Sequence, residues 1–78
     1  MWKLISNGKK QIRWDRTDLD RAFIIGRYSA TGRCWIIEYF EALSGFFETG
    51  GPKIYVMANC RREAEKMIED VKRQAEAA

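Results

Sequence analysis

The sequence predicts a small α+β domain, an antiparallel sheet of four to five strands with one C-terminal helix packed on a face. Three observations lead to this prediction. Residues 1–14 and 22–40 have the patterns of two β-hairpins, residues 53–58 have that of a further strand, and the C-terminal stretch repeats apolar residues at helical spacing. The 78 residues, 46% of them hydrophobic, have room for one core, so we expect a single domain over residues 1–78.

The first hairpin is predicted by Asn7-Gly8, the strongest short-range hairpin signal, because both residues tolerate a positive φ angle. A three-residue loop that ends at Gly8 pairs Trp2 with Ile12. We prefer this register because it separates an apolar face from a polar one. The apolar face then carries four side chains, those of Trp2, Leu4, Ile12 and Trp14.

The second hairpin is apolar on both faces, which makes it the most informative feature of the chain. Its strands, Ala22–Tyr28 and Cys34–Phe40, are rich in β-branched and aromatic residues. A three-residue loop that ends at Gly32 opposes Ile25 to Ile37. One face then carries Phe23, Ile25, Trp35, Ile37 and Tyr39, and the other carries Ile24, Tyr28, Cys34, Ile36 and Phe40, together with Gly26 and Glu38.

Residues 41–52 are predicted to form a long loop, since Gly45 and the run Gly50–Pro52 favour bends. Phe46 and Phe47 lie inside this stretch. These two aromatic side chains either fold back over a thin core or protrude as anchors for a pocket on another protein.

The C-terminal helix is predicted by an apolar stripe at spacings of three and four residues. Asn59 is the expected N-cap, because its side-chain oxygen can accept hydrogen bonds from the first backbone amides of a helix. The rest of the helix surface is charged, so we expect the stripe to pack on the sheet. It consists of Ala64, Met67, Ile68, Val71 and Ala75.

One helix covers only one face of such a sheet, while the second hairpin is apolar on both. Two arrangements follow from this shortage of cover. Either the first hairpin folds over the second face and closes a small barrel or sandwich, or that face is left for a partner, since a large exposed apolar patch marks an interaction site.

Catalytic chemistry finds little support in the composition. The chain has no histidine, which removes the commonest general base and metal ligand, and with it the Cys–His and Ser–His nucleophile pairs. Two cysteines do not make a four-ligand zinc site without unusual carboxylates. We therefore expect no enzyme activity, no cofactor, no metal and no small-molecule substrate.

The cysteines and the hydropathy pattern bear on location. We expect Cys34 and Cys60 to be reduced thiols of a cytoplasmic protein, with a Cys34–Cys60 disulfide as the alternative. The N-terminus has no secretory pattern, and no stretch approaches the ~20 apolar residues of a membrane span. We therefore expect no membrane association.

The charge is unevenly distributed, because residues 1–33 carry a net charge of +5 and residues 34–78 carry −2. Basic side chains interleaved with aromatic ones on a sheet can grip single-stranded nucleic acid by charge and stacking. The same basic residues can also be explained without a ligand, because exposed charges keep a protein in solution and prevent an edge strand from pairing with other chains. The candidate nucleic-acid contacts are Lys3, Lys9, Lys10, Arg13, Arg27 and Arg33.

The leading functional hypothesis is a non-catalytic protein-binding domain that acts through the uncovered apolar face, with a homodimer as a compatible variant. In its general profile, one compact aromatic-rich domain without catalytic motifs, the chain resembles small inhibitors and adaptors of viruses and mobile elements, anti-CRISPR proteins among them. That resemblance implies occlusion of a larger host complex. The candidate partner-binding residues are Trp35, Tyr39, Phe46, Phe47 and Tyr28. A small nucleic-acid-binding domain is the alternative.

Overall fold

The computed structural model describes residues 1–19, 21–43, 46–47 and 52–77, and within these it describes the backbone alone for 42–43 and 46–47. Six strands precede one helix. The strands are β1 (Trp2–Asn7), β2 (Gln11–Arg16), β3 (Ala22–Tyr28), β4 (Trp35–Leu43), β5 (Phe46–Phe47) and β6 (Ile54–Ala58), and the helix is α1 (Arg61–Ala77). The predicted α+β class is therefore confirmed.

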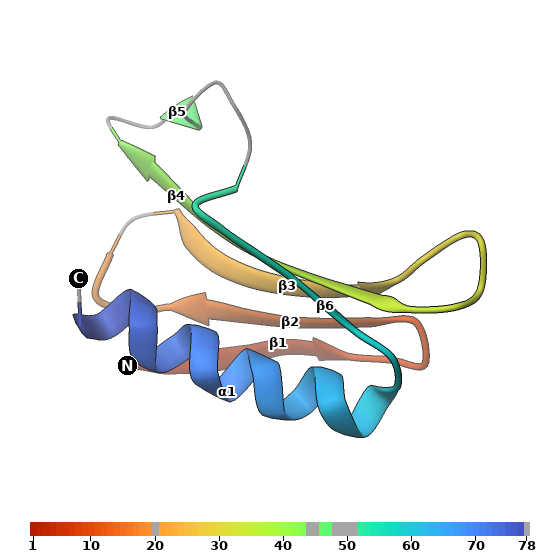
Figure 1. Cartoon of the computed structure of the whole chain (residues 1–78). Helices are drawn as coiled ribbons and strands as arrows, with labels where there is room; N and C mark the ends of the chain where they lie inside the picture. The colour runs from red at the N-terminus through yellow and green to blue at the C-terminus, as the bar shows by residue number, and fades with distance from the viewer. Residues whose placement is uncertain (20, 44–45, 48–51, 78) are drawn as a thin grey trace.

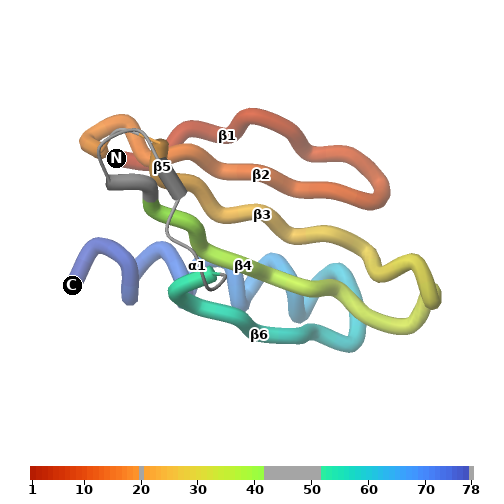
Figure 2. The backbone as a smooth tube through the Cα atoms, turned by 90° about the horizontal axis from the view of Figure 1, so that it is seen from above, coloured from red at the N-terminus to blue at the C-terminus, as the bar shows by residue number. Residues whose placement is uncertain are grey.

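The strands form one antiparallel sheet in which β1, β2, β3 and β4 follow one another, and β5 and β6 both pair with β4 (Figures 1 and 2). Figure 1 shows α1 running along one side of this sheet. Of the two arrangements expected from the sequence, the open one is found. β1 continues the sheet beside β2, and among the described elements β5 alone rises on the side away from α1, at the end of β4 (Figure 1).

The core lies between α1 and the helix-facing side of β3, β4 and β6. Here Ile24 and Ile37 on the sheet meet Ile68 and Val71 on the helix, and all four are almost completely buried. Gly26 permits the close approach, because a Cβ atom added there would lie 3.3 Å from Ile68 Cδ1. The predicted apolar stripe of α1 is thus confirmed as the packing surface of the helix.

The register of the first hairpin differs from the prediction. Gly8 N–H donates to Gln11 O at 2.8 Å, so the turn is the pair Lys9-Lys10, and Trp2 lies opposite Arg16 instead of Ile12. A β-bulge between Leu4 and Ser6 returns Trp2 and Leu4 to the face that carries Ile12 and Trp14. The predicted grouping of these four side chains therefore stands, although their pairing was wrong.

The register of the second hairpin is displaced by one residue from the prediction. Ser29 N–H donates to Cys34 O, which leaves a four-residue loop, and Ile25 lies opposite Glu38 instead of Ile37. A one-residue slip exchanges the two faces of one strand relative to the other. Ala22, Ile24 and Gly26 of β3 consequently share the helix side with Trp35, Ile37 and Tyr39, whereas Phe23 and Ile25 lie on the uncovered side with Ile36 and Phe40.

Two further expectations change in the second half of the chain. The stretch 41–52 is not entirely a loop, because β4 continues to Leu43 and the backbone of Phe46–Phe47 pairs with its end as β5. The helix begins at Arg61, and Cys60 O accepts the first helical hydrogen bond from Ala64 N–H at 2.9 Å. Cys60 therefore occupies the capping position expected for Asn59, whose own N–H donates to a Glu63 carboxylate oxygen.

The core contact of α1 yields a stability prediction. Ile68→Ala should lower the free energy of unfolding by about 2–5 kcal/mol. It leaves a cavity between Gly26 and Ile37, and Gly26 has no side chain that could move into it. Met57→Ala, which truncates an exposed apolar side chain of β6, should cost less than about 1 kcal/mol. Urea unfolding followed by circular dichroism checks both values. Equal losses for the two variants would contradict this location of the core.

Candidate functional site

The side of the sheet away from α1 carries a group of apolar side chains on β3, β4 and β6, with the carboxylate of Glu38 among them between Ile25 and Tyr55. The pairing places Phe23 beside Phe40, and Ile36 beside Met57, while Tyr55 follows on the same side of β6. The Phe23 and Phe40 rings stack with centroids 5.0 Å apart. We call this set the open strip. Its members are Phe23, Ile25, Ile36, Phe40, Tyr55 and Met57.

Exposure rises along the open strip toward the edge strand. Ile25, in the middle of the sheet, is buried by its neighbours, whereas Tyr55 is 54% and Met57 53% exposed on β6. Aromatic and methionine side chains are enriched where proteins contact one another, because they offer large areas of adaptable apolar surface. The outer end of the open strip is therefore the part with most surface to offer.

The charged side chains on this face are paired with one another. Arg13 Nε lies 2.7 Å from Asp15 Oδ1, and the Arg13 guanidinium stacks over the Phe23 ring at 4.1 Å. Arg27 and Glu38 form a second pair at 3.4 Å. The first pair lies on β2 at one side of the open strip, and the second joins β3 to β4 inside it, so the charges on this face largely cancel.

Trp35 and Tyr39, expected at the partner surface, lie on the other side of the sheet. Each is only 3% exposed and belongs to the core beneath α1. The one-residue register difference in the second hairpin is the reason. An indole and a phenol this deeply buried have almost no surface to give a partner, so the face predicted for these two residues was wrong.

The other three expected partner residues fall in different places. Tyr28 is exposed at the end of β3, where its ring tilts against Trp35 at 5.6 Å and its hydroxyl donates to Gly32 O. The backbone of Phe46 and Phe47 forms β5, while their side chains lie outside the described part of the chain. Their role as anchors stays a prediction.

The basic residues proposed to contact nucleic acid are divided between two regions. Arg13 and Arg27 are the paired arginines of the open face, and Lys3 lies opposite Asp15 in the register of β1 and β2. The rest gather at the end of the sheet where the hairpins turn. Tyr28 N–H donates to Lys10 O at 2.9 Å, which holds the turn containing Lys9 beside the loop containing Arg33.

The start of α1 adds a further cation to this turn end. The Arg61 guanidinium donates to Gly8 O at 2.7 Å and also to Asn7 Oδ1. The N-terminus of a helix carries partial positive charge from its free amide groups. The turn end of the molecule therefore brings Arg61 close to the turn that contains Lys9 and Lys10, and sequence reasoning missed the contribution of α1 because it depends on tertiary contact.

A groove of about 220 Å³ separates the first hairpin from α1. Its apolar walls come from both elements, and two carboxylates of α1 stand at its rim, each paired with a helix cation. Ligand sites for small molecules usually exceed about 300 Å³, so this groove has room for little more than one side chain. It is lined by Leu4, Asn7, Ile12, Trp14, Glu65, Ile68 and Glu69.

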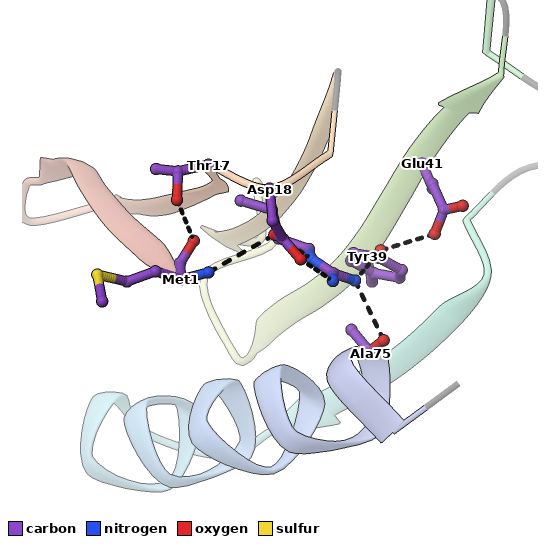
Figure 3. A network of polar contacts seen from close by, with 7 residues as sticks. Met1, Thr17, Asp18, Tyr39, Glu41 and Ala75 are labelled. Carbon is purple, nitrogen blue, oxygen red and sulfur yellow. Dashed lines mark hydrogen bonds and ion pairs between the residues drawn. The ribbon is translucent and has the colours of Figure 1, made fainter.

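Arg16 is the centre of a polar network at the end of the sheet away from the hairpin turns. Figure 3 shows this network, with Asp18, Tyr39 and Ala75 among the labelled residues. Its side chain is 10% exposed and lies 2.6 Å from Asp18 Oδ2, while its guanidinium also donates to Tyr39 Oη and, at 3.1 Å, to Ala75 O near the end of α1. Tyr39 in turn donates to Glu41 at 2.8 Å. The network joins β2, β4 and α1, and we interpret it as a structural tie.

Electrostatics in this network favour the charged pair. The hydrogen bonds that Arg16 donates hold the pKa of the Asp18 carboxyl well below its usual range, and the same contact raises the pKa of Arg16. The terminal ammonium of Met1 adds to the effect, 3.6 Å from Asp18 Oδ1. Burial, reinforced by the bond to Glu41, raises the pKa of the Tyr39 phenol.

Two other kinds of site are absent from the part of the chain that the structure describes. There, no three histidine, cysteine, aspartate or glutamate side chains come together as ligands for a metal ion. No helix in these same residues combines the length and the apolar surface needed to cross a bilayer. Cys34 and Cys60 are both free thiols.

No protein-family model, curated protein or solved structure matches the chain. The open strip is therefore identified from geometry alone. Sequence reasoning placed Phe23 and Ile25 with Trp35 and overlooked Tyr55 and Met57, although these two alternate with Ile54 and Val56 in β6. Strand alternation places Tyr55 and Met57 together on one side of β6, but their exposure depends on which side α1 covers.

The Arg16 network predicts how stability depends on pH. Asp18 has a lower pKa in the folded than in the unfolded protein, where it is about 3.9, so its contribution is present above that value and is lost as pH falls. Asp18→Asn should remove this contribution and flatten the acid side of the stability profile. Urea unfolding between about pH 2 and pH 7 measures it, with Asp70→Asn of α1 as the matched control. Superimposable profiles for the wild type and Asp18→Asn would contradict it.

Proposed function

We propose that the protein is a non-catalytic binding domain that uses the open strip to dock on an apolar surface of another protein, as a small inhibitor or adaptor does. The observation that carries the proposal is the outer end of the open strip on β6, where Tyr55 and Met57 are more than half exposed. Soluble proteins seldom expose a contiguous apolar patch that has no binding role.

The chemistry of the open face favours a protein over a charged ligand. Arg13 and Arg27 are already neutralised by Asp15 and Glu38, so an anionic ligand would have to break two intramolecular ion pairs. A partner with projecting apolar side chains needs no such exchange. It gains affinity by removing Tyr55 and Met57 from water, with stacked Phe23 and Phe40 as a firm base.

Occlusion is the mode of action that this geometry supports. The strip lies on strands that are held by the core and is not borne on a loop, so docking requires little ordering of the backbone and loses little entropy. A flat, pre-formed surface can cover a partner's own functional face. We include a cytoplasmic location in the proposal, because both thiols are free and Cys60 is exposed.

A paired substitution tests the proposal. Tyr55→Ser with Met57→Ser should reduce capture of a partner from a lysate of the source cells by at least about tenfold, because it removes the exposed end of the strip. Leu4→Ser with Ile5→Ser is the matched control, since these exposed apolar side chains lie on the opposite edge strand. The control should capture the same protein as the wild type, identified by mass spectrometry.

Circular dichroism establishes that both double variants are folded. Equal capture by the Tyr55/Met57 variant and the wild type would contradict docking through the open strip. A failure of the wild type to retain any specific protein would count equally against it.

The basic turn end supports a second candidate function, contact with nucleic acid. Lys9, Lys10 and Arg33 extend from adjacent turns, and Arg61 is held against the first of them. Phosphate contacts by such residues supply affinity without sequence preference. The aromatic platform required for stacking on single strands is smaller here, with Tyr28 as the exposed ring at this end.

The second candidate predicts salt-sensitive binding. Single- and double-stranded probes should shift in a gel at low salt, and the shift should weaken as salt rises, because counterions compete for the phosphates. Lys9→Glu combined with Lys10→Glu and Arg33→Glu should abolish it. Lys66→Glu with Arg73→Glu, on α1, changes the charge elsewhere and serves as the control. No shift at micromolar protein would exclude this function.

A further inference from the structure

The two edges of the sheet differ in how they are protected from pairing with another strand. Edge strands expose unpaired backbone N–H and C=O groups, and proteins usually blunt them with bulges, lysines or prolines. β1, at one edge, contains a bulge between Leu4 and Ser6 and carries Lys3. These features interrupt the regular ladder that a further strand would need.

β6, at the other edge, has none of these protections. Its five residues, Ile54–Ala58, contain no charge, proline or glycine, and their pairing with β4 runs from Tyr39↔Ile54 to Trp35↔Ala58 without a shift in register. Among the described residues no strand pairs with its outer side. Figure 2 shows β6 as the outermost strand of the sheet.

We propose that β6 pairs antiparallel with β6 of a second copy of this chain, which joins two sheets into one across a two-fold axis. A second copy of the chain is the expected partner strand, because β6 is self-complementary: it can pair antiparallel with an identical strand. In a pairing centred on Val56, all five residues of each strand take part, and each Tyr55 lies opposite the partner copy's Met57 on the open side. No charged side chain of the strand opposes another.

The side chains of β6 support the same register. Methionine sulfur makes favourable contacts with aromatic rings, and the two-fold axis produces two Tyr–Met pairs side by side. On the helix side, Ile54 lies opposite the small Ala58 of the other copy, which avoids a clash beneath the sheet. The open strips of the two copies then become one strip across the junction, because each reaches its edge at Tyr55 and Met57.

The inference does not depend on docking to another protein, since it concerns the backbone edge of β6. It is tested first on the wild-type protein by sedimentation equilibrium over a wide range of concentration. The mass should rise toward twice the monomer value and should be insensitive to salt, because the paired strands are uncharged. A monomer mass at the highest concentration reached would overturn the proposal.

Amide hydrogen exchange by NMR then identifies the surface. Between dilute and concentrated protein, alternate amides of β6 should exchange more slowly, because every second N–H points to the outer side and becomes hydrogen bonded only in the dimer. The amides of β1 should exchange equally at both concentrations. A dimer without alternate protection in β6 would overturn pairing through this edge.

Two neighbouring proline variants provide the matched test. Tyr55→Pro and Val56→Pro each remove one N–H, and adjacent residues of a strand point these groups to opposite sides. The variant that loses the bond to β4 should be destabilised, whereas the other should fold and remain monomeric at concentrations where the wild type and Ile5→Lys dimerise. A folded proline variant that dimerises as strongly as the wild type would overturn the proposal. If both variants unfold, the exchange pattern of the wild type decides the outcome.

Discussion

The contact between Ile68 of α1 and the backbone gap at Gly26 fixes the position of the helix on the sheet. A side chain at position 26 would stand between the two layers, so the glycine determines how closely Ile68 approaches Ile37. Because the helix sits over β3, β4 and β6, it leaves the first hairpin only partly covered, and a groove remains between Trp14 and α1. This placement puts the one helix of the described residues entirely on one side of the sheet, so the other side is not covered by a helix within them.

The sequence predicted the elements of the fold better than their registers. In the first hairpin the error was four residues, an even number, and Trp2 and Leu4 kept their predicted face because side chains alternate with a period of two. In the second hairpin the error was one residue, and Trp35 and Tyr39 exchanged the open face for the core. Hydrophobic patterning could not detect this error, because that hairpin is apolar on both sides and either register buries isoleucines.

The candidate site was accordingly predicted in kind but not in its residues. An uncovered apolar face followed from counting one helix against a sheet with two apolar sides, and that inference needed no register. Naming the residues on that face did need the register, since a shift of one residue moved Trp35 from the predicted open face to the core. The bulge near Ile5 and the contact of Arg61 with Gly8 depend on tertiary packing. No local pattern of residues predicts either of them.

The two proposed modes of association both use β6, and the charges and the edges of the sheet favour this strand for each of them. Arg13 pairs with Asp15 on β2, Arg27 of β3 pairs with Glu38 inside the open strip, and the most exposed apolar side chains lie beyond them on β6. The open strip ends at β6, an edge strand, so water contacts Tyr55 and Met57 both from the open face and from the edge of the sheet. A protein docked on the face excludes water from the face, and a strand paired with β6 excludes it from the edge. The edge and the face of β6 are separate surfaces. The two proposals are therefore compatible: a second copy would pair with the backbone edge of β6, while a different protein would bind the strip that the two copies form together.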